Sequence, residues 1–127
     1  MDTKYEKGLE LLNELHGGNT GEEIINKFSD ICPKMAQMTI ETIFGDLFQR
    51  EILYLKTREL TIIASLTTQG SCLPQLEAHI QAAIKVSATK EEIAEVILQT
   101  AYFSGFPVAA NAMICLKNVC SKIYMEN

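Results

Sequence analysis

The sequence predicts an all-α protein, and three features of the pattern support this fold class. Apolar residues recur at helical spacing along most of the chain, and helix-stopping glycines and helix-opening prolines separate the apolar segments. No segment alternates polar and apolar residues as a half-buried strand does. With 127 residues the chain is long enough to bury one core. We therefore expect a single helical-bundle domain of about seven helices over residues 1–127.

The first half of the chain should contain three helices. Residues 5–16 have one apolar face, which ends at a pair of glycines. Thr20 and Glu23 have the spacing of a capping box, so Thr20 should cap a short second helix that ends before Pro33. Pro33 should open a third helix that continues to about Arg50.

Two further helices follow in the middle of the chain. Thr57 is the expected N-cap of a helix over residues 58–68, and Gly70 is its expected stop. Pro74 lies near the first turn of the next helix, where its missing N–H group is tolerated. That helix should run to about Val86.

The last two helices have equally clear starts. Thr89 and Glu92 form a second capping-box pattern, which should open a helix over residues 90–104. Pro107 should open the final helix, which reaches about Tyr124.

Composition narrows the classes of partner. The chain has 11 Lys and Arg against 16 Asp and Glu, and its basic residues do not cluster, so a nucleic-acid partner is not expected. Its apolar runs are far shorter than the roughly 20 residues of a membrane span. Residues 1–7 are not followed by the apolar core of a signal peptide. We expect a cytoplasmic protein without a membrane partner.

Three helical segments are apolar over much of their circumference. They are residues 57–69, the segment that carries Cys72 and His79, and residues 90–104. A helix that is hydrophobic nearly all round is buried, and a small bundle has room for only one or two such helices. Some of these faces should therefore meet another subunit, which predicts a homo-oligomer.

The four cysteines do not resemble a disulfide framework, because no C-x-x-C pair and no export signal is present. Cys32, Cys115 and Cys120 are expected to be buried thiols that act as small apolar side chains. The two histidines lie far apart and form no H-x-x-x-H pattern, so no metal site is expected.

Cys72 and His79 form the most informative pair in the chain. Cys72 lies at a helix start, where the free amides and the helix dipole stabilise a thiolate. His79 follows seven residues later, roughly 10 Å along the helix axis. Gln75 stands where a second cysteine would complete C-x-x-C. Cys72 is therefore either an ordinary packed thiol or a reactive one.

Five segments of the chain carry a resemblance to a known family. They read ETIFGDLFQR at 41–50, LKTRELT at 55–61, LEAHIQAA at 76–83, TKEEIAEV at 89–96 and AYFSGFPVAANA at 101–112. On these segments the chain resembles the carboxymuconolactone decarboxylase family, of the alkylhydroperoxidase D-like superfamily. The resemblance implies an all-helical subunit that assembles as trimers or hexamers and works on a small molecule without metal or organic cofactor.

The family contains two chemistries, and the first is thiol-dependent reduction of alkyl hydroperoxides. That branch carries C-x-x-C-x-x-x-H with a glutamate about a dozen residues upstream. Cys72 and His79 match this pattern, whereas Gln75 replaces the second cysteine. Leu60 stands near the glutamate position, and Glu59 is one residue out of register. The disulfide relay of that branch is therefore incomplete here.

The second chemistry is decarboxylation of 4-carboxymuconolactone, and the resemblance is closer to this branch. The reaction needs a general acid near neutral pH and cationic donors for an anionic substrate. His79 is the best proton donor, and Arg50 and Arg58 are the best carboxylate-binding groups. Glu41 is a candidate for orienting His79 if the helices bring the two together.

Each of these residues also has a structural interpretation. His79 fits a satisfied core residue, Arg58 fits a partner of Glu59 or of another helix, and Arg50 fits a helix-end cation. Glu41 fits an exposed helix charge, and Tyr102 and Asn111 are equally consistent with pocket lining and with helix packing.

Three functional hypotheses follow from the sequence. The first is a homo-oligomeric decarboxylase-like enzyme that uses His79 as the acid/base group. The second is a thiol-dependent peroxidase that uses Cys72, with a resolving thiol from Cys32, Cys115, Cys120, another subunit or a small molecule. The third is a binding module without catalysis.

Overall fold

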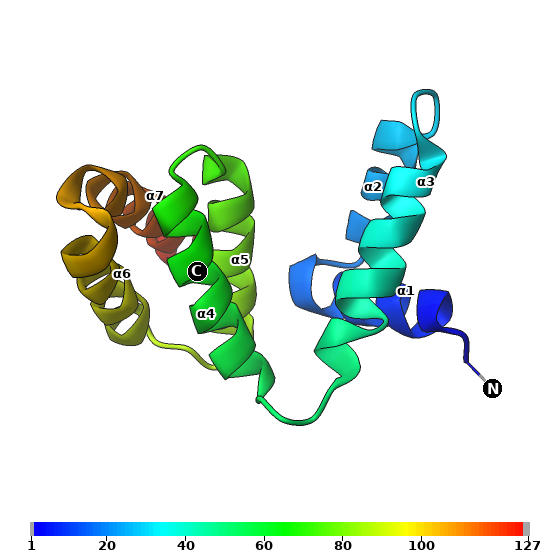
Figure 1. Ribbon diagram of the computed structural model, residues 1–127, viewed down its shortest axis with the longest axis horizontal. Helices are drawn as coiled ribbons and strands as arrows, with labels where there is room; N and C mark the ends of the chain where they lie inside the picture. Colours follow the sequence, from blue (N-terminus) through cyan, green and yellow to red (C-terminus); the bar gives the residue numbers. More distant parts are fainter. Residues whose placement is uncertain (1, 126–127) are drawn as a thin grey trace. The chain divides into compact units, whose positions relative to one another are not determined.

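The computed structural model describes residues 2–125, and all regular structure in that range is helical (Figure 1). The all-α prediction is confirmed. In chain order the elements are α1 (Lys4–His16), α2 (Thr20–Phe28), α3 (Pro33–Met38), the π-helical η1 (Thr39–Phe44), the 3₁₀ turn η2 (Leu47–Gln49), α4 (Leu55–Gln69), α5 (Leu73–Lys85), α6 (Lys90–Ser104) and α7 (Phe106–Met125).

The chain divides into two compact units, and the boundary follows Leu53. The first unit contains α1 to η2, and the second begins at Tyr54 and contains α4 to α7. The assignment of residues 1–127 to a single domain stays a prediction. Within the described range no helix has both the length and the apolar character of a membrane span. The cytoplasmic location also stays a prediction.

The first unit is built around close packing of α1 against η1. Gly8 of α1 is buried, and a Cβ atom there would meet the carbonyl oxygen of Ile40 and, at 2.8 Å, the amide nitrogen of Gly45. The buried side chains of Leu12 and Phe44 belong to the same unit. Two glycines thus allow the two backbones to approach more closely than any side chain would permit.

The expected long helix over residues 33–50 is interrupted, so this prediction was wrong in its second half. After α3 the chain changes to the π-helical η1, where the Gly45 amide donates to the carbonyl of Ile40 at 2.9 Å. The hydroxyls of Thr39 and Thr42 donate to main-chain carbonyls four residues back. Such bonds and a π-helical turn both disturb regular α-helix geometry.

Two predicted N-caps were also wrong. Thr20 does not cap α2, because its hydroxyl donates to the carbonyl of His16 at the end of α1, 2.8 Å away, and Asn19 occupies the N-cap position. Thr57 lies inside α4, which begins two residues earlier after Tyr54. The Thr20 hydroxyl thus binds the last carbonyl of α1 and does not cap the free amides of α2.

The second unit packs α4, α5, α6 and α7 around one hydrophobic core (Figure 1). Its fully buried side chains include Ile63 of α4, Ile80 of α5 and Ile97 of α6. Cys115 and Cys120 of α7 are buried as expected, and burial raises the pKa of both thiols.

The prediction that Cys32 is buried was wrong. This cysteine is exposed in the turn before α3, where it occupies the N-cap position. A cap residue lies outside the regular part of its helix and does not share the buried face.

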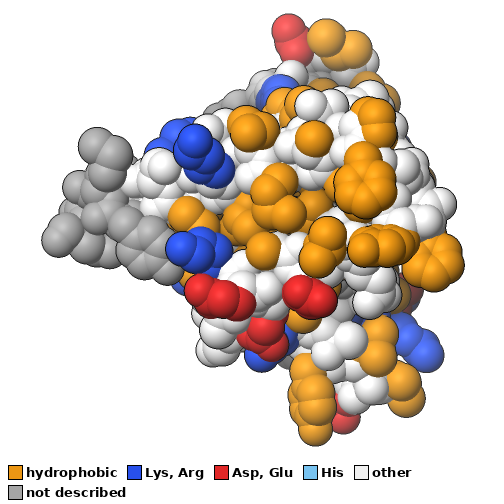
Figure 2. All heavy atoms as spheres, turned by 90° about the vertical axis from the view of Figure 1, so that its left-hand side faces the viewer, with side chains coloured by type: hydrophobic (Ala, Val, Ile, Leu, Met, Phe, Trp, Pro, Cys, Tyr) orange, Lys and Arg blue, Asp and Glu red, His pale blue; other side chains and the backbone are white. Residues whose placement is uncertain are grey.

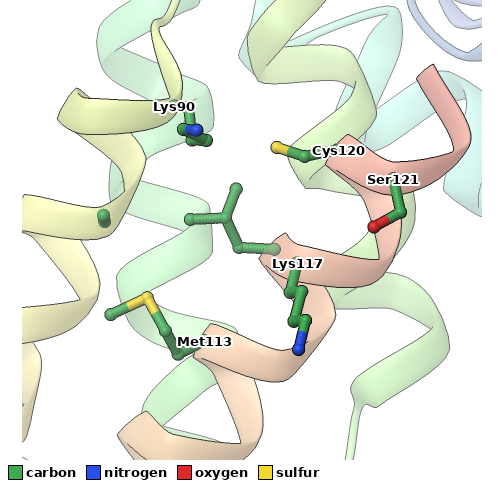
Figure 3. A pocket seen from close by; sticks show the side chains of 7 residues that line it. Lys90, Met113, Lys117, Cys120 and Ser121 are labelled. Carbon is green, nitrogen blue, oxygen red and sulfur yellow. The ribbon is translucent and has the colours of Figure 1, made fainter. Parts of the chain in front are cut away.

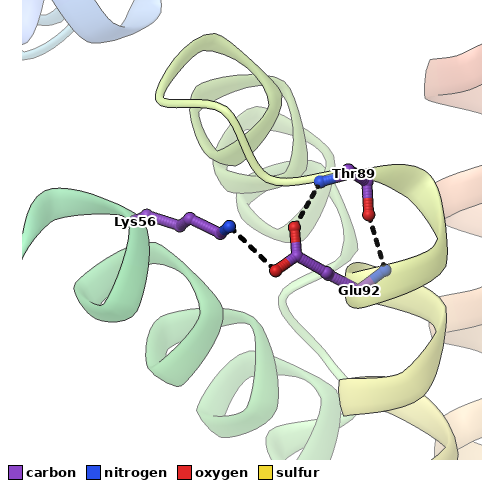
Figure 4. Close-up of polar contacts among 3 residues, drawn as sticks. All are labelled: Lys56, Thr89 and Glu92. Carbon is purple, nitrogen blue, oxygen red and sulfur yellow. Dashed lines mark hydrogen bonds and ion pairs between the residues drawn. The ribbon is translucent and has the colours of Figure 1, made fainter.

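The start of α6 forms the capping box that the sequence predicts (Figure 4). The Glu92 amide donates to the Thr89 hydroxyl at 3.0 Å, and the Thr89 amide donates to the Glu92 carboxylate at 2.9 Å. Lys56 of α4 reaches the other carboxylate oxygen of Glu92 at 2.8 Å. Hydrogen bonding from Lys56 and then from the Thr89 backbone lowers the pKa of Glu92. Folding therefore favours the ionised form of Glu92, and the contact joins the starts of α4 and α6.

Candidate functional site

A histidine and a buried carboxylate are in contact inside the second unit. The Oε1 atom of Glu59 lies 2.8 Å from the Nδ1 atom of His79. The side chain of Glu59 is 0% exposed, and that of His79 is 19% exposed. Glu59 comes from α4 and His79 from α5, two helices that pack against each other.

Helix periodicity places both side chains at this contact. Glu59, Ile63 and Thr67 are spaced four residues apart on the buried face of α4. On α5, His79 lies between the buried residues Leu76 and Ile80 along the helix, beside the same core. The contact is therefore part of the packing between two helices and is held by the apolar residues around it.

The geometry of the contact fits one arrangement of hydrogens in particular. An ionised carboxylate only accepts hydrogen bonds, so the tautomer of His79 that donates to it carries its hydrogen on Nδ1, and Nε2 is then the nitrogen at which a second proton would be exchanged. A buried charge is costly unless it is paired and hydrogen-bonded, and the Oε2 atom of Glu59 has no hydrogen-bond partner among the described residues. The contact with His79 is thus the hydrogen bond that accompanies the burial of this carboxylate.

Glu59 is the residue that the sequence interpretation missed. Comparison with the C-x-x-C-x-x-x-H pattern left it one residue out of register, yet the structure places its carboxylate on His79. The signal was the four-residue spacing from Ile63 and Thr67, which indicates that Glu59 points toward the core. A charged residue in a buried stripe is unusual enough to suggest a partner.

Glu41 and Arg50 belong to the first unit. Glu41 lies in η1 and accepts a hydrogen bond from the side chain of Gln37 at 3.1 Å. Arg50 is exposed and directly follows η2, where its amide donates to the carbonyl of Leu47. A carboxylate contact to His79 is made by Glu59 within the second unit. Catalytic and substrate-binding roles for Glu41 and Arg50 stay predictions.

Arg58 precedes Glu59 on α4 and is also buried, with only 8% of the residue exposed. Neighbouring helix positions differ by about 100° in direction, so Arg58 and Glu59 point toward different surroundings although both are buried. Substrate binding by the Arg58 guanidinium stays a prediction.

Cys72 occupies the N-cap position of α5 and is half-buried. Its thiol donates to the side-chain oxygen of Gln69 at 3.3 Å, and its sulfur lies 3.9 Å from the Ser71 hydroxyl. The expected position at a helix start is confirmed. Its redox activity stays a prediction.

Tyr102 and Asn111 are both exposed. The ring of Tyr102 lies 5.9 Å from that of Phe106, at the junction of α6 and α7. Their proposed place in a pocket stays a prediction.

Comparisons with known proteins agree with the family resemblance. The sequence model of one protein family, the carboxymuconolactone decarboxylase family, matches residues 33–118. An uncharacterized 15.0 kDa protein from the nqo9–nqo10 intergenic region of Paracoccus denitrificans is 36% identical over 97 residues, which is 76% of this chain and 69% of that protein. A protein of Acinetobacter baylyi named 4-carboxymuconolactone decarboxylase is 27% identical over 112 residues, which is 88% of this chain and 83% of that protein.

Proposed function

This chain belongs to the carboxymuconolactone decarboxylase family, and from that premise we propose that it decarboxylates a small lactone carboxylate without a cofactor. The contact between Glu59 and His79 is the observation that carries the proposal. It supplies a histidine that is in contact with a buried carboxylate and whose side chain is still partly exposed. General acid catalysis needs such a group.

The proposed reaction begins with loss of CO₂ from the substrate carboxylate. The carbon–carbon bond to that carboxylate breaks, and its electron pair passes into the conjugated lactone. The carbon atom that carries the developing charge then takes a proton from Nε2 of His79, and water restores the proton to the imidazole. Glu59 holds the ring and stabilises the imidazolium, and Arg58 and Arg50 are the candidates for binding the substrate carboxylates.

A thiol-dependent peroxidase is the second candidate, and one observation favours it. Glu59 is in contact with His79, so the chain contains the paired acid and histidine that the peroxidase branch also has. Gln75 still occupies the position of the resolving cysteine. A peroxidase would therefore need Cys32, Cys115, Cys120, another subunit or a small-molecule thiol to reduce the sulfenic acid.

A pair of assays on the wild type and Cys72→Ser separates these functions. We expect the wild type to convert 4-carboxymuconolactone with release of CO₂, and Cys72→Ser to retain that rate within about twofold, because the proposed proton transfer uses no thiol. Reduction of cumene hydroperoxide with dithiothreitol is the parallel measurement.

Loss of a wild-type peroxidase activity in Cys72→Ser would contradict the decarboxylase proposal. Inactivity of the wild type in both assays would favour a binding module.

The α6–α7 side of the second unit carries an exposed apolar surface (Figure 2). Large exposed side chains on these two helices are Leu98, Tyr102, Phe103, Phe106 and Ile114. Phe103 is 88% exposed and Tyr102 is 73% exposed. Contiguous apolar surface of this kind is typical of interfaces between proteins. We infer that copies of the chain associate through this surface, as trimers or hexamers.

The variant Phe103→Asp tests the proposed interface. We expect the wild type to sediment well above the 14.2 kDa of one chain, and the variant to shift toward that mass because a charge in an apolar interface is costly. Gln81→Asp adds the same charge at an exposed position on α5 and serves as the control. A monomeric wild type, or equal masses for wild type and Phe103→Asp, would contradict the assignment.

A further inference from the structure

A groove of about 560 Å³ lies between α6 and α7, on the surface of the second unit (Figure 3). Its volume falls in the range of about 300–1,000 Å³ that is common for small-molecule sites. None of its lining residues is Glu59, Cys72 or His79. The groove is therefore separate from the contact on which the proposed function rests.

The floor and walls of the groove are apolar. Leu116 and Cys120 of α7 form part of the lining and are almost fully buried. Met113 of α7 and Ala94 of α6 are half-buried and complete the apolar lining. The positions 113, 116 and 120 share one face of α7, so this surface is continuous along the helix. An alkyl chain on this surface would be removed from water over much of its length.

The charges at the rim are all of one sign. Lys90, the first residue of α6, and Lys117 of α7 are the ionisable lining residues apart from the Cys120 thiol, and both lysines are exposed. This is a departure from the chain as a whole, which has 16 acidic against 11 basic residues. Figure 3 shows the Lys90 ammonium and Cys120 toward one end of the groove and Met113 and Lys117 toward the other.

The electrostatic surroundings of Cys120 agree with this distribution. Burial is the first cause that raises its pKa, and the charge of Lys90, which lines the same groove, acts in the opposite direction. Glu91 is the acidic group that also acts on Cys120, and it lies outside the groove lining. Of these two charged residues, only the cation lines the groove.

We propose that this groove binds an amphipathic carboxylate, with the carboxylate at Lys90 and a medium-length alkyl chain along Met113 and Leu116. The aliphatic stem of Lys117 covers the end of the chain, while its ammonium group stays in water. A second copy docked on a two-fold axis through the groove would bring the same two cations together, which is unfavourable. Two cations beside an apolar lining are instead complementary to a ligand that has both a negative charge and an apolar part.

Calorimetric titration with decanoate tests the site, and Lys90→Gln is the informative variant. We expect saturable binding to the wild type and about tenfold weaker binding to Lys90→Gln, the change that corresponds to about 1.4 kcal/mol for a charge-assisted contact. Lys85→Gln removes the same charge from an exposed residue of α5 that does not line the groove, and it should bind as the wild type does. Decanol should bind more weakly than decanoate because it lacks the negative charge.

The location is tested by a second measurement on the same protein. Decanoate should slow alkylation of Cys120, followed by peptide mass spectrometry, and Met113→Glu should remove this protection by placing a negative charge in the path of the chain. His79→Ala should bind decanoate normally, so failure of the decarboxylase proposal and failure of this one are distinguishable. The proposal would be overturned if Lys85→Gln and Lys90→Gln weakened binding equally, or if binding did not saturate. It would also be overturned if decanoate no longer bound at protein concentrations at which the chain self-associates, because the groove would then be covered by a second copy.

Discussion

Replacement of His79 by alanine is expected to reduce the decarboxylation rate by about 10²–10⁴-fold, the usual contribution of a positioned general acid. The imidazole is the group that returns a proton to carbon in the proposed reaction, and Glu59 holds its Nδ1 atom at 2.8 Å. The loss should fall mainly on kcat, because the proton is transferred in the transition state and contributes little to substrate binding. Steady-state kinetics on 4-carboxymuconolactone measure this effect.

Glu59→Gln distinguishes a positioning role from a purely structural one. A glutamine keeps the shape and can still accept a hydrogen bond, but it cannot stabilise the imidazolium by charge. We expect a smaller loss of kcat than for His79→Ala, with little change in KM. The reason is that the variant still orients the ring but lacks the charge that would act in the transition state.

The control is Glu95→Gln, which removes a carboxylate from an exposed position on α6 and should leave kcat unchanged. Turnover that survives in His79→Ala would show that the acid is another residue. An equal kcat in the wild type and Glu59→Gln would mean that the buried carboxylate serves stability alone.

Gly8→Ala is expected to destabilise the first unit by about 1–3 kcal/mol, the usual cost of inserting atoms into a packed interior. The added methyl group would meet the carbonyl oxygen of Ile40 and the backbone of Gly45, neither of which can move as a side chain can. The sign of the change in unfolding free energy separates two effects. Helix propensity alone would make the alanine variant more stable by about 1 kcal/mol, whereas the steric clash makes it less stable. Urea unfolding followed by circular dichroism measures the change in midpoint.

Gly18→Ala is the matched control for this experiment. A Cβ atom at Gly18 would meet no atom within 4 Å, and the residue is exposed. We expect its free energy of unfolding to stay within a few tenths of a kcal/mol of the wild-type value, as for most surface substitutions. If Gly8→Ala raises the midpoint, the close approach of α1 and η1 is not present in solution.

Local signals in the sequence were sufficient for much of the fold. Gly70 ends α4 with a left-handed backbone, Pro74 lies in the first turn of α5, and the Thr89 capping box opens α6, all as predicted. Each of these depends on a few neighbouring residues, so no knowledge of the tertiary contacts is needed.

Predictions that depended on competition between neighbours were less successful. Thr20 has the residue type and spacing of a cap, but its hydroxyl donates to the carbonyl of His16. The helix expected over residues 33–50 changes to π-helical geometry before Gly45. A hydroxyl or an amide binds whichever acceptor the folded chain brings closest, and local sequence does not specify that acceptor.

The candidate site also has one part that local sequence predicts and one part that depends on tertiary packing. By itself the sequence determined an all-helical chain and its family resemblance, and it singled out His79 as the candidate acid/base group. Only the tertiary structure decided which carboxylate accompanies that histidine, and it is Glu59 of α4. The physical reason is that a helix face is set by local periodicity, whereas the contact between residues twenty positions apart depends on how α4 and α5 pack.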